Sequence, residues 1–434
     1  MNTLVSDRKT LFCMLCAVLL IAACSGDPAA ERADTAAVAK WNQLATDAVV
    51  KFNAGDAAGG IPPMIESRMY AMAFSAAHDA LNAIDARYQP YLTNANMSNA
   101  SPDAAVAAAV HDVMVAQLPP LHTDLDAAYN AALAGITDGD KKTNGIALGK
   151  QMAAAINAAR QNDGSANAAI PYVPGSAPGN YRFTPPFDGP PFNGFAALPA
   201  WGNVKPFVAT SGAQFRAPPP YRVTDAAYTA DFNEIKRLGA ATGSTRTPEQ
   251  SEIGRFWLES APLGWNRIAA TLAKSRSLNG WDQARLFALV HLAVADGYIS
   301  SFDSKYFYNF WRPITAVRLA DSDGNPDTAG DPNWQTFDPV TPPIPDYPSA
   351  HATAGGAASA VMRAALGSDD VAFTQTSTTL PGVTRSFTKL SQAATENNLS
   401  RIYVGYHFRL AIDEGLKQGD AVGKLVVQTR LQPL

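Results

Sequence analysis

A segment rich in proline and aromatic residues, residues 170–220, most constrains how this chain can fold. Twelve of its 51 residues are proline. Each proline fixes φ and removes a backbone donor, which excludes a long helix or a central strand here. Large aromatic side chains alternate with the prolines, among them Tyr181, Phe187 and Trp201. A solvated linker gains nothing from so much apolar surface. We therefore interpret the segment as an ordered loop that packs on the rest of the protein; a domain boundary is the alternative.

On both sides of this segment, apolar residues recur at helical spacing. Hydrophobic residues make up 47% of the chain, and alanine, the best helix former, supplies many of them. The periodicity predicts helices over residues 36–52, 64–86, 103–117, 124–133, 141–162, 225–239, 248–258, 268–275, 280–302 with an extension towards 311, 349–367, 389–398 and 410–431. The threonine-rich residues 373–387, with Pro381-Gly382 at their centre, predict a β-hairpin. We therefore expect an all-α, helix-bundle fold with long proline-rich loops and one small hairpin.

The first residues have the features of an export signal. Arg8 and Lys9 precede an apolar run of 13 residues, 11–23. A membrane-spanning helix needs about 20 apolar residues, whereas this length fits a secretory signal. The run ends in Leu-Ile-Ala-Ala-Cys24, which resembles a bacterial lipoprotein lipobox. We expect a signal peptide over residues 1–23, a lipid anchor on Cys24 and a tether over residues 24–33; an ordinary signal peptide is the alternative.

Charge and cysteine content exclude several classes of function. The chain has 34 Lys and Arg against 38 Asp and Glu, a net charge of −4. Because it has no basic runs, we do not expect a nucleic-acid partner. If the signal is removed, Cys13 and Cys16 leave with it and Cys24 carries lipid. No disulfide, cysteine-ligated metal or cysteine nucleophile is then expected.

Two clusters in the C-terminal half combine cationic or imidazole groups with turn-forming residues. In the first, Lys305 and Arg312 are seven residues apart, a spacing that puts both on one face of a helix. Two cations so close together favour an anion between them. The alternative is that both are solvated cations on an outer helix face, which would show the same spacing. In the second, Pro348-Ser349-Ala350-His351 precedes a run of small helix formers, which predicts a helix start with Ser349 near the cap. Such an end favours anions through its free N–H groups.

A third cluster contains Ser400, Arg401, Gly405 and His407. The planar guanidinium of Arg401 suits oxyanions. In a straight helix His407 would lie about 120° around from Arg401. For both to reach one ligand, the site must lie at a helix end or bend, which Gly405 permits. An ordinary helix with a core histidine is the alternative for this cluster alone.

In chain order, the three clusters match the pattern K-x6-RP, PSGH and SR-x5-H. The chain therefore resembles the superfamily of vanadium-dependent haloperoxidases, type 2 phosphatidic acid phosphatases and bacterial acid phosphatases. Ala350 stands where the family usually has Gly, which would cause strain if that position needs a positive φ. Further similarity to bacterial haloperoxidases includes His78-Asp79-Ala-Leu-Asn-Ala and Phe310-Trp311-Arg312-Pro313. It covers most of the chain after the signal and implies one haloperoxidase-like domain over residues 34–434, with its active-site half at about 280–434.

The resemblance implies a role for each motif residue. Lys305, Arg312 and Arg401, with the Ser349 hydroxyl and the Ala350 N–H, would bind vanadate, or phosphate in the same pocket. His407 would be the axial vanadium ligand and His351 the acid–base residue, while Lys305 would also polarise hydrogen peroxide. These roles imply a haloperoxidase that uses hydrogen peroxide, halide and small organic acceptors, in the periplasm or anchored to the outer membrane through Cys24.

Three functions share this predicted pocket. A vanadate-dependent haloperoxidase is favoured, with iodide as the expected halide and bromide as a further one. Ile344 occupies the place of a second histidine in brominating algal members, which argues against a bromoperoxidase of that type. The second function is a periplasmic acid phosphatase, in which His407 would form a phosphohistidine. The third is a lipoprotein that binds an oxyanion without turnover.

Overall fold

The computed structural model describes residues 33–55 and 60–434. Residues 1–32, which include the predicted signal peptide, Cys24 and nearly all of the predicted tether, lie outside the described residues. The helices and the hairpin are α1 (Ala37–Gly55), α2 (Pro63–Ile84), α3 (Pro102–Gln117), α4 (His122–Ala134), α5 (Asp140–Arg160), α6 (Ala226–Leu238), α7 (Pro248–Phe256), α8 (Ala261–Ser275), α9 (Gly280–Tyr308), α10 (Pro313–Leu319), α11 (Ala350–Leu366), β1 (Asp370–Thr376), β2 (Thr384–Lys389), α12 (Leu390–Tyr403) and α13 (Arg409–Thr429). The all-α prediction is confirmed.

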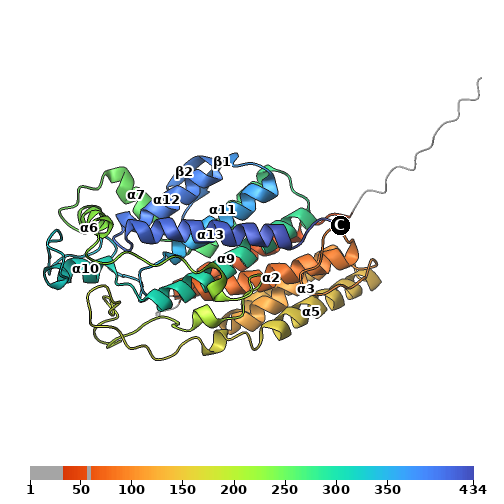
Figure 1. The fold of residues 1–434 in the computed structure, drawn as a ribbon. Coiled ribbons are helices and arrows are strands. Elements are labelled where there is room, and N and C mark those ends of the chain that lie inside the picture. The colour runs from red at the N-terminus through yellow and green to blue at the C-terminus, as the bar shows by residue number, and fades with distance from the viewer. Residues whose placement is uncertain (1–32, 56–59) are drawn as a thin grey trace, which may run out of the picture. The chain divides into compact units, whose positions relative to one another are not determined.

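The long helix α9 forms the centre of the bundle. It packs against α2 on one side and against α11 and α13 on the other, and α3 and α5 extend the layer beyond α2 (Figure 1). Its length and composition would allow a membrane crossing, but 94% of its apolar window is buried inside the protein. Helix α9 is therefore a core helix, and its C-terminal end reaches the part of the fold that carries the three motif clusters.

Helices α11 and α13 pack with their backbones in direct contact. A Cβ at Gly415 of α13 would lie 2.5 Å from the carbonyl oxygen of Ser349, and one at Gly419 would lie 2.0 Å from that of Thr353. Only glycine permits so close an approach. The Ser349 N–H also donates to the carbonyl of Ala411 (2.8 Å). The start of α11, where the second cluster lies, is therefore fixed in place by α13.

Four helix predictions in the C-terminal half need correction. The helix predicted over residues 389–398 continues for five more residues, because α12 ends at Tyr403. The first turns of α8 were missed, although Pro262 lies at the preferred place for proline in a helix start. Helix α9 does not continue to Arg312: it ends at Tyr308, and Asn309 takes a left-handed conformation with φ of 55°. The seven-residue α10 was not predicted. A proline disfavours helical conformation in the residue before it. Arg312 is therefore the N-cap residue, and α10 begins at Pro313.

The predicted hairpin is present. Strands β1 and β2 pair antiparallel with Phe373 opposite Phe387, and Gly382 in the turn has a φ of 85°. Both phenylalanines are buried, so the hairpin is attached to the helical body by its apolar face.

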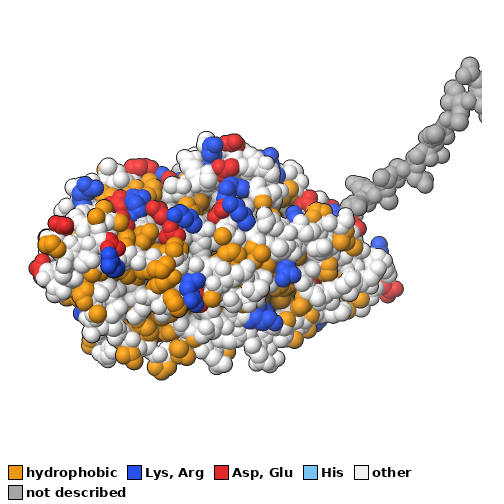
Figure 2. All heavy atoms as spheres, viewed as in Figure 1, with side chains coloured by type: hydrophobic (Ala, Val, Ile, Leu, Met, Phe, Trp, Pro, Cys, Tyr) orange, Lys and Arg blue, Asp and Glu red, His pale blue; other side chains and the backbone are white. Residues whose placement is uncertain are grey.

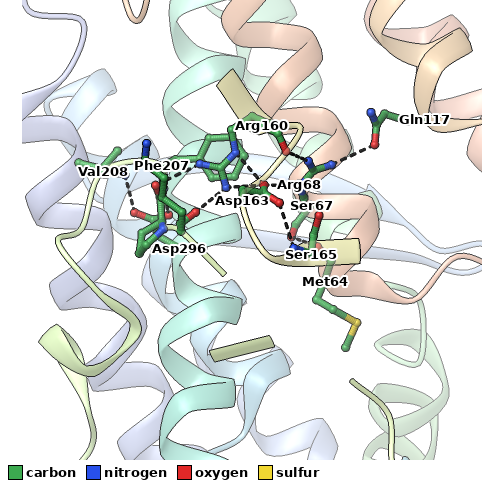
Figure 3. Close-up of polar contacts among 12 residues, drawn as sticks. Met64, Ser67, Arg68, Gln117, Arg160, Asp163, Ser165, Phe207, Val208 and Asp296 are labelled. Atoms are coloured by element: carbon green, nitrogen blue, oxygen red, sulfur yellow. Dashed lines mark hydrogen bonds and ion pairs between the residues drawn. The ribbon is translucent and has the colours of Figure 1, made fainter. Parts of the chain in front are cut away.

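The proline-rich segment is ordered and packs on the bundle, as the sequence predicts. Buried Asp296 of α9 accepts hydrogen bonds from the backbone N–H groups of residues 207–209 (2.6–2.8 Å). Arg160 of α5 donates to the carbonyl of Pro206 (3.1 Å) and shares the Asp163 carboxylate with Arg68 of α2 (Figure 3). Two buried carboxylates and two arginines thus fasten the loop across α2, α5 and α9.

On the face shown in Figure 2, basic and acidic side chains are interspersed over the surface. This distribution agrees with the small net charge of −4.

Candidate oxyanion site

Lys305 lies in the last turn of α9 and is completely buried. Its ammonium group donates to the backbone carbonyls of Pro345 (2.7 Å) and Asp346 (2.9 Å). These bonds tie the end of α9 to the segment that leads into α11. Among the described residues no carboxylate lies within ion-pair distance of Lys305.

Arg312 reaches the same place by a different route from the one that the sequence predicts. It lies at the N-cap position of α10 rather than two turns along the helix of Lys305. Its buried guanidinium donates to the carbonyls of Ile344 (2.8 Å) and Tyr406 (2.9 Å) and to Nε2 of His407 (2.9 Å). The break after α9 therefore turns Arg312 towards the second and third clusters.

The second cluster forms the start of α11, as predicted. Ser349 is the N-cap, and its hydroxyl accepts from the N–H of Ala352 (3.4 Å). Ala350 begins the helix outside the positive-φ region, so alanine causes no backbone strain here. Its N–H has no acceptor within the helix and is available to an anion. His351 follows in the first turn as a half-buried residue whose Nε2 is enclosed and has no hydrogen-bond partner.

The third cluster bends at Gly405, also as predicted. Helix α12 ends at Tyr403, and Gly405 has a φ of 88°. A Cβ there would lie 2.6 Å from the carbonyl oxygen of Gly239, so the bend requires glycine. Arg401 is held from behind by bonds to the Ser400 hydroxyl (2.9 Å) and the Trp257 carbonyl (2.6 Å). The bend brings His407 to the guanidinium of Arg312.

The site contains a residue that the sequence reasoning did not single out. Asp346 is fully buried, and its Oδ1 lies 2.8 Å from Nδ1 of His407 and 3.8 Å from Nη1 of Arg312. Burial raises the pKa of its carboxyl group to about 7, against the opposing charges of Arg312 and Lys305. The sequence signal was its position, a lone carboxylate three residues before the helix cap Ser349.

Asp346 and Arg312 together define the state of His407. Burial lowers the pKa of the imidazole well below its usual value, and the charges of Arg312, Lys305 and Arg401 lower it further. The ring is therefore neutral at pH 7. Arg312 donates to Nε2, which places the lone pair of the neutral ring on Nε2 and the proton on Nδ1, beside the Asp346 carboxylate.

Positive charge in the site exceeds negative charge. Of the three buried cations, Lys305 and Arg312 share the fully buried carboxylate of Asp346. The carboxylate that acts on Arg401 is the half-buried Asp338. Burial lowers the pKa of all three, that of Arg401 to about 10, and repulsion from Arg312 lowers those of Lys305 and Arg401 further. Uncompensated buried cations are costly unless a counter-charge is supplied. A bound anion removes this cost.

The buried polar atoms without a partner show which anion fits. Nη2 of Arg312 and Nε2 of His351 are buried without a hydrogen-bond partner. They add to the Ser349 hydroxyl and the Ala350 N–H at the end of α11. Donors from two separate segments suit a multivalent oxyanion. The neutral His407 has its lone pair on Nε2, which accepts from Arg312 in this structure and would bind a Lewis acid in place of that bond. The residues therefore fit vanadate, which contains both an oxyanion shell and a metal centre, and they equally accept phosphate.

Other acidic and imidazole side chains lie elsewhere. Asp303 pairs with Arg216 (2.7 Å), and Asp413 lies near Asn398 (3.5 Å), so neither orients the three cations. His78 and His291 are buried in the bundle and bonded to Gln89 and Asn266; His111 and His122 share Asp126. No group of three or more His, Cys, Asp or Glu able to hold a metal ion occurs among residues 33–55 and 60–434.

Comparison with known proteins identifies relatives of this arrangement. Residues 285–433 match the family model described as the VCPO second helical-bundle domain. The vanadium chloroperoxidase of Curvularia inaequalis is 36% identical over 205 residues, which cover 40% of this chain and 33% of that protein. The aligned part thus spans about a third of the length of this curated relative.

Solved structures extend the similarity to nearly the whole fold. A structure described as the first bacterial vanadium-dependent iodoperoxidase has a TM-score of 0.78 and 25% identity, and the match covers 91% of this chain and 97% of the other. A bacterial vanadium-dependent chloroperoxidase in its holo form has a TM-score of 0.68 and 19% identity, with coverage of 85% and 92%. At that identity the second match shows the fold alone.

Proposed function

We propose that this chain, which is similar to vanadium-dependent haloperoxidases, is a vanadate-dependent enzyme that oxidises halide with hydrogen peroxide to hypohalous acid. Iodide is the proposed preferred halide. The observation that carries the proposal is the set of three buried cations around a neutral His407, with one carboxylate beside them. The similarity to a bacterial iodoperoxidase supports the choice of halide.

Bound vanadate would supply a Lewis acid that activates hydrogen peroxide without a change of oxidation state. The protein's own residues then have three tasks: to bind the oxyanion, to provide a nitrogen ligand and to transfer a proton. Lys305, Arg312 and Arg401 neutralise the oxyanion, and the end of α11 binds it through Ser349 and the Ala350 N–H. His407 contributes the Nε2 lone pair, with its ring orientation fixed by Asp346.

The third task is proton transfer. The reaction consumes one proton for each hypohalous acid formed, because one peroxide oxygen is transferred to the halide and the other leaves as water. We assign this proton transfer to His351, whose enclosed Nε2 has no other partner. Burial and the charge of Arg401 hold the pKa of His351 well below its usual value. The imidazole is therefore neutral at rest and returns a proton readily after taking one up.

The test uses purified protein without its N-terminal signal, depleted of oxyanions and then loaded with orthovanadate. We expect peroxide-dependent oxidation of iodide, slower oxidation of bromide, and inhibition by phosphate. His407→Ala and His351→Ala should lose turnover, and His351→Ala should still bind orthovanadate. His122→Ala is the matched control, because this histidine is a surface residue with a side chain 59% exposed.

Two results would replace the proposal. Hydrolysis of p-nitrophenyl phosphate without halide oxidation would make the protein a phosphatase with His407 as nucleophile. Orthovanadate or phosphate binding without either reaction would make it an oxyanion-binding protein. Faster oxidation of bromide than of iodide would agree with the proposed haloperoxidase activity but would refute the proposed preference for iodide.

We also propose that the protein is exported and anchored through lipid on Cys24, on the basis of the apolar run and the Leu-Ile-Ala-Ala-Cys sequence. Expression in a bacterium with a labelled fatty acid tests this. Label is expected in the wild type and absent from Cys24→Ser. Release of an unlabelled wild-type protein into the soluble periplasm would support an ordinary signal peptide and refute the anchor.

A further inference from the structure

Polar groups from two further helices lie close together directly behind His351. Asn397 of α12 and Trp265 of α8 are both completely buried. The Asn397 side-chain N–H group donates to the backbone carbonyl of His351 (3.3 Å). A Cβ at Gly355, one turn further along α11, would lie 2.6 Å from Nδ2 of Asn397 and 3.2 Å from Nε1 of Trp265. The two side chains thus close over the first turns of α11.

These groups have hydrogen-bonding capacity that packing alone does not explain. Oδ1 of Asn397, Nε1 of Trp265 and Nε2 of His351 are all buried without a hydrogen-bond partner. A buried unpaired polar group costs about 1–3 kcal/mol. A leucine at position 397 would avoid that cost in a core of this kind. A polar residue in such a place therefore indicates a role beyond stability.

Asn397 also affects the charge state of the imidazole. Burial and the charge of Arg401 lower the pKa of His351, and the Asn397 side chain opposes them. Asn397 and Arg401 are four residues apart on α12 and so lie on the same face of the helix. One rigid helix therefore carries both the cation that contacts the oxyanion pocket and the amide that contacts His351.

We propose that Asn397 is the positioning residue for His351. It holds the first turn of α11 and the imidazole in one orientation towards the oxyanion that Lys305, Arg312 and Arg401 neutralise. The inference rests on the proposed function, because His351 needs a fixed orientation only if it transfers a proton. Gly355 takes part by leaving room for the amide.

The main variant is Asn397→Leu, which has a similar volume and removes the hydrogen bond to the His351 carbonyl. We expect kcat for iodide oxidation to fall about tenfold or more, as for a displaced acid–base group. The dissociation constant for orthovanadate should stay within about twofold, since no cation is altered. The matched control is Asn398→Leu: this neighbour is also buried, but its amide faces Asp413. Its kcat should stay within about twofold of the wild type.

A double-mutant cycle separates positioning from a merely structural role. In a His351→Ala background, Asn397→Leu should have no further effect on the residual rate. If it lowers that rate by the same factor as in the wild type, Asn397 does not act through His351 and the proposal is overturned. Loss of orthovanadate binding in Asn397→Leu would overturn it as well. Should the leucine variant fail to fold, as judged by circular dichroism, Asn397→Ser takes its place.

A second readout needs no turnover. Nitrogen-15 NMR of the His351 imidazole in the oxyanion-free protein should show its pKa lowered further in Asn397→Leu and unchanged in Asn398→Leu. The charged or titratable groups that face this ring, Arg401 and His407, are the same in both variants. An unchanged His351 signal in Asn397→Leu would contradict the proposal. If the wild type oxidises no halide, the proposed function fails, and the NMR result still decides whether Asn397 orients the imidazole.

Discussion

Glu66 offers a direct test of how the bundle treats a buried carboxyl group. It lies in the first turn of α2, fully buried; Oε2 accepts a hydrogen bond from Ser260, and Oε1 has no partner. Burial raises its pKa from 4.5 to about 8, the bond from Ser260 opposes this, and the charge of Glu259 adds to it. Glu66 is therefore protonated at neutral pH.

The sign of the pH effect follows from proton binding. Between pH 4.5 and about 8 the folded protein keeps a proton that the unfolded chain has released. Its contribution to the unfolding free energy is thus fully present below pH 4.5 and is lost as the pH rises through 8. At about 1.4 kcal/mol for each pH unit between the two values, the loss amounts to about 5 kcal/mol.

Glu66→Gln removes this titration and keeps the shape and an acceptor oxygen. We expect the variant to gain stability over the wild type by about 4 kcal/mol from pH 5 to about pH 8, and the gain to level off above pH 8. Urea unfolding of both proteins, at intervals of one pH unit in oxyanion-free buffer, measures this difference in unfolding free energy. The contributions of the other titrating groups are the same in both proteins and cancel. Met64→Leu is the control, because Met64 is buried in the same first turn of α2 and cannot ionise; its stability difference from the wild type should not change with pH. A pH-independent difference for Glu66→Gln would refute the reasoning.

Three further substitutions test the loop, the bend and the helix start. Asp296→Asn removes the charged carboxylate that accepts hydrogen bonds from the N–H groups of residues 207–209. We expect the unfolding free energy to fall by about 2 kcal/mol and limited proteolysis within residues 170–220 to become faster. A cleavage rate equal to that of the wild type would contradict this. Gly405 has a φ of 88°, and a Cβ there would lie 2.6 Å from the Gly239 carbonyl oxygen. Gly405→Ala should therefore lower the unfolding free energy by about 1–3 kcal/mol. It should also weaken orthovanadate binding, measured by calorimetry. Ala350→Gly should cost about 0.5–1 kcal/mol in urea unfolding and leave the orthovanadate dissociation constant within about twofold; a large gain in affinity would show that alanine strains the pocket.

The sequence predicts much of the helical half of the fold because its signals are local. Ser349 before small helix formers marks a helix start, and Gly405 marks the bend that turns His407 inwards. Both depend on the conformational preferences of single residues, which the chain displays without tertiary information. The pattern of three clusters then predicts which residues share a pocket.

The predictions fail at two places in the site, for different reasons. Spacing alone places Lys305 and Arg312 on one helix, yet Asn309 ends α9 and Pro313 starts a new helix. The proline rule was available for Arg312, but the aromatic residues between the two cations maintain helical periodicity. Asp346 was missed for a different reason. Its role depends on His407, 61 residues further along the chain, and no local signal reports that 2.8 Å contact.

The central claim is that Lys305, Arg312 and Arg401 form one pocket for a tetrahedral oxyanion. Calorimetric titration of the oxyanion-free protein with orthovanadate tests it most directly. We expect one saturable site for each chain, competition by phosphate, and binding at least about thirtyfold weaker in Arg312→Met, because removing a buried charge partner costs about 2 kcal/mol or more. A wild type without saturable binding, or an Arg312→Met variant that folds and binds as the wild type does, would contradict the account.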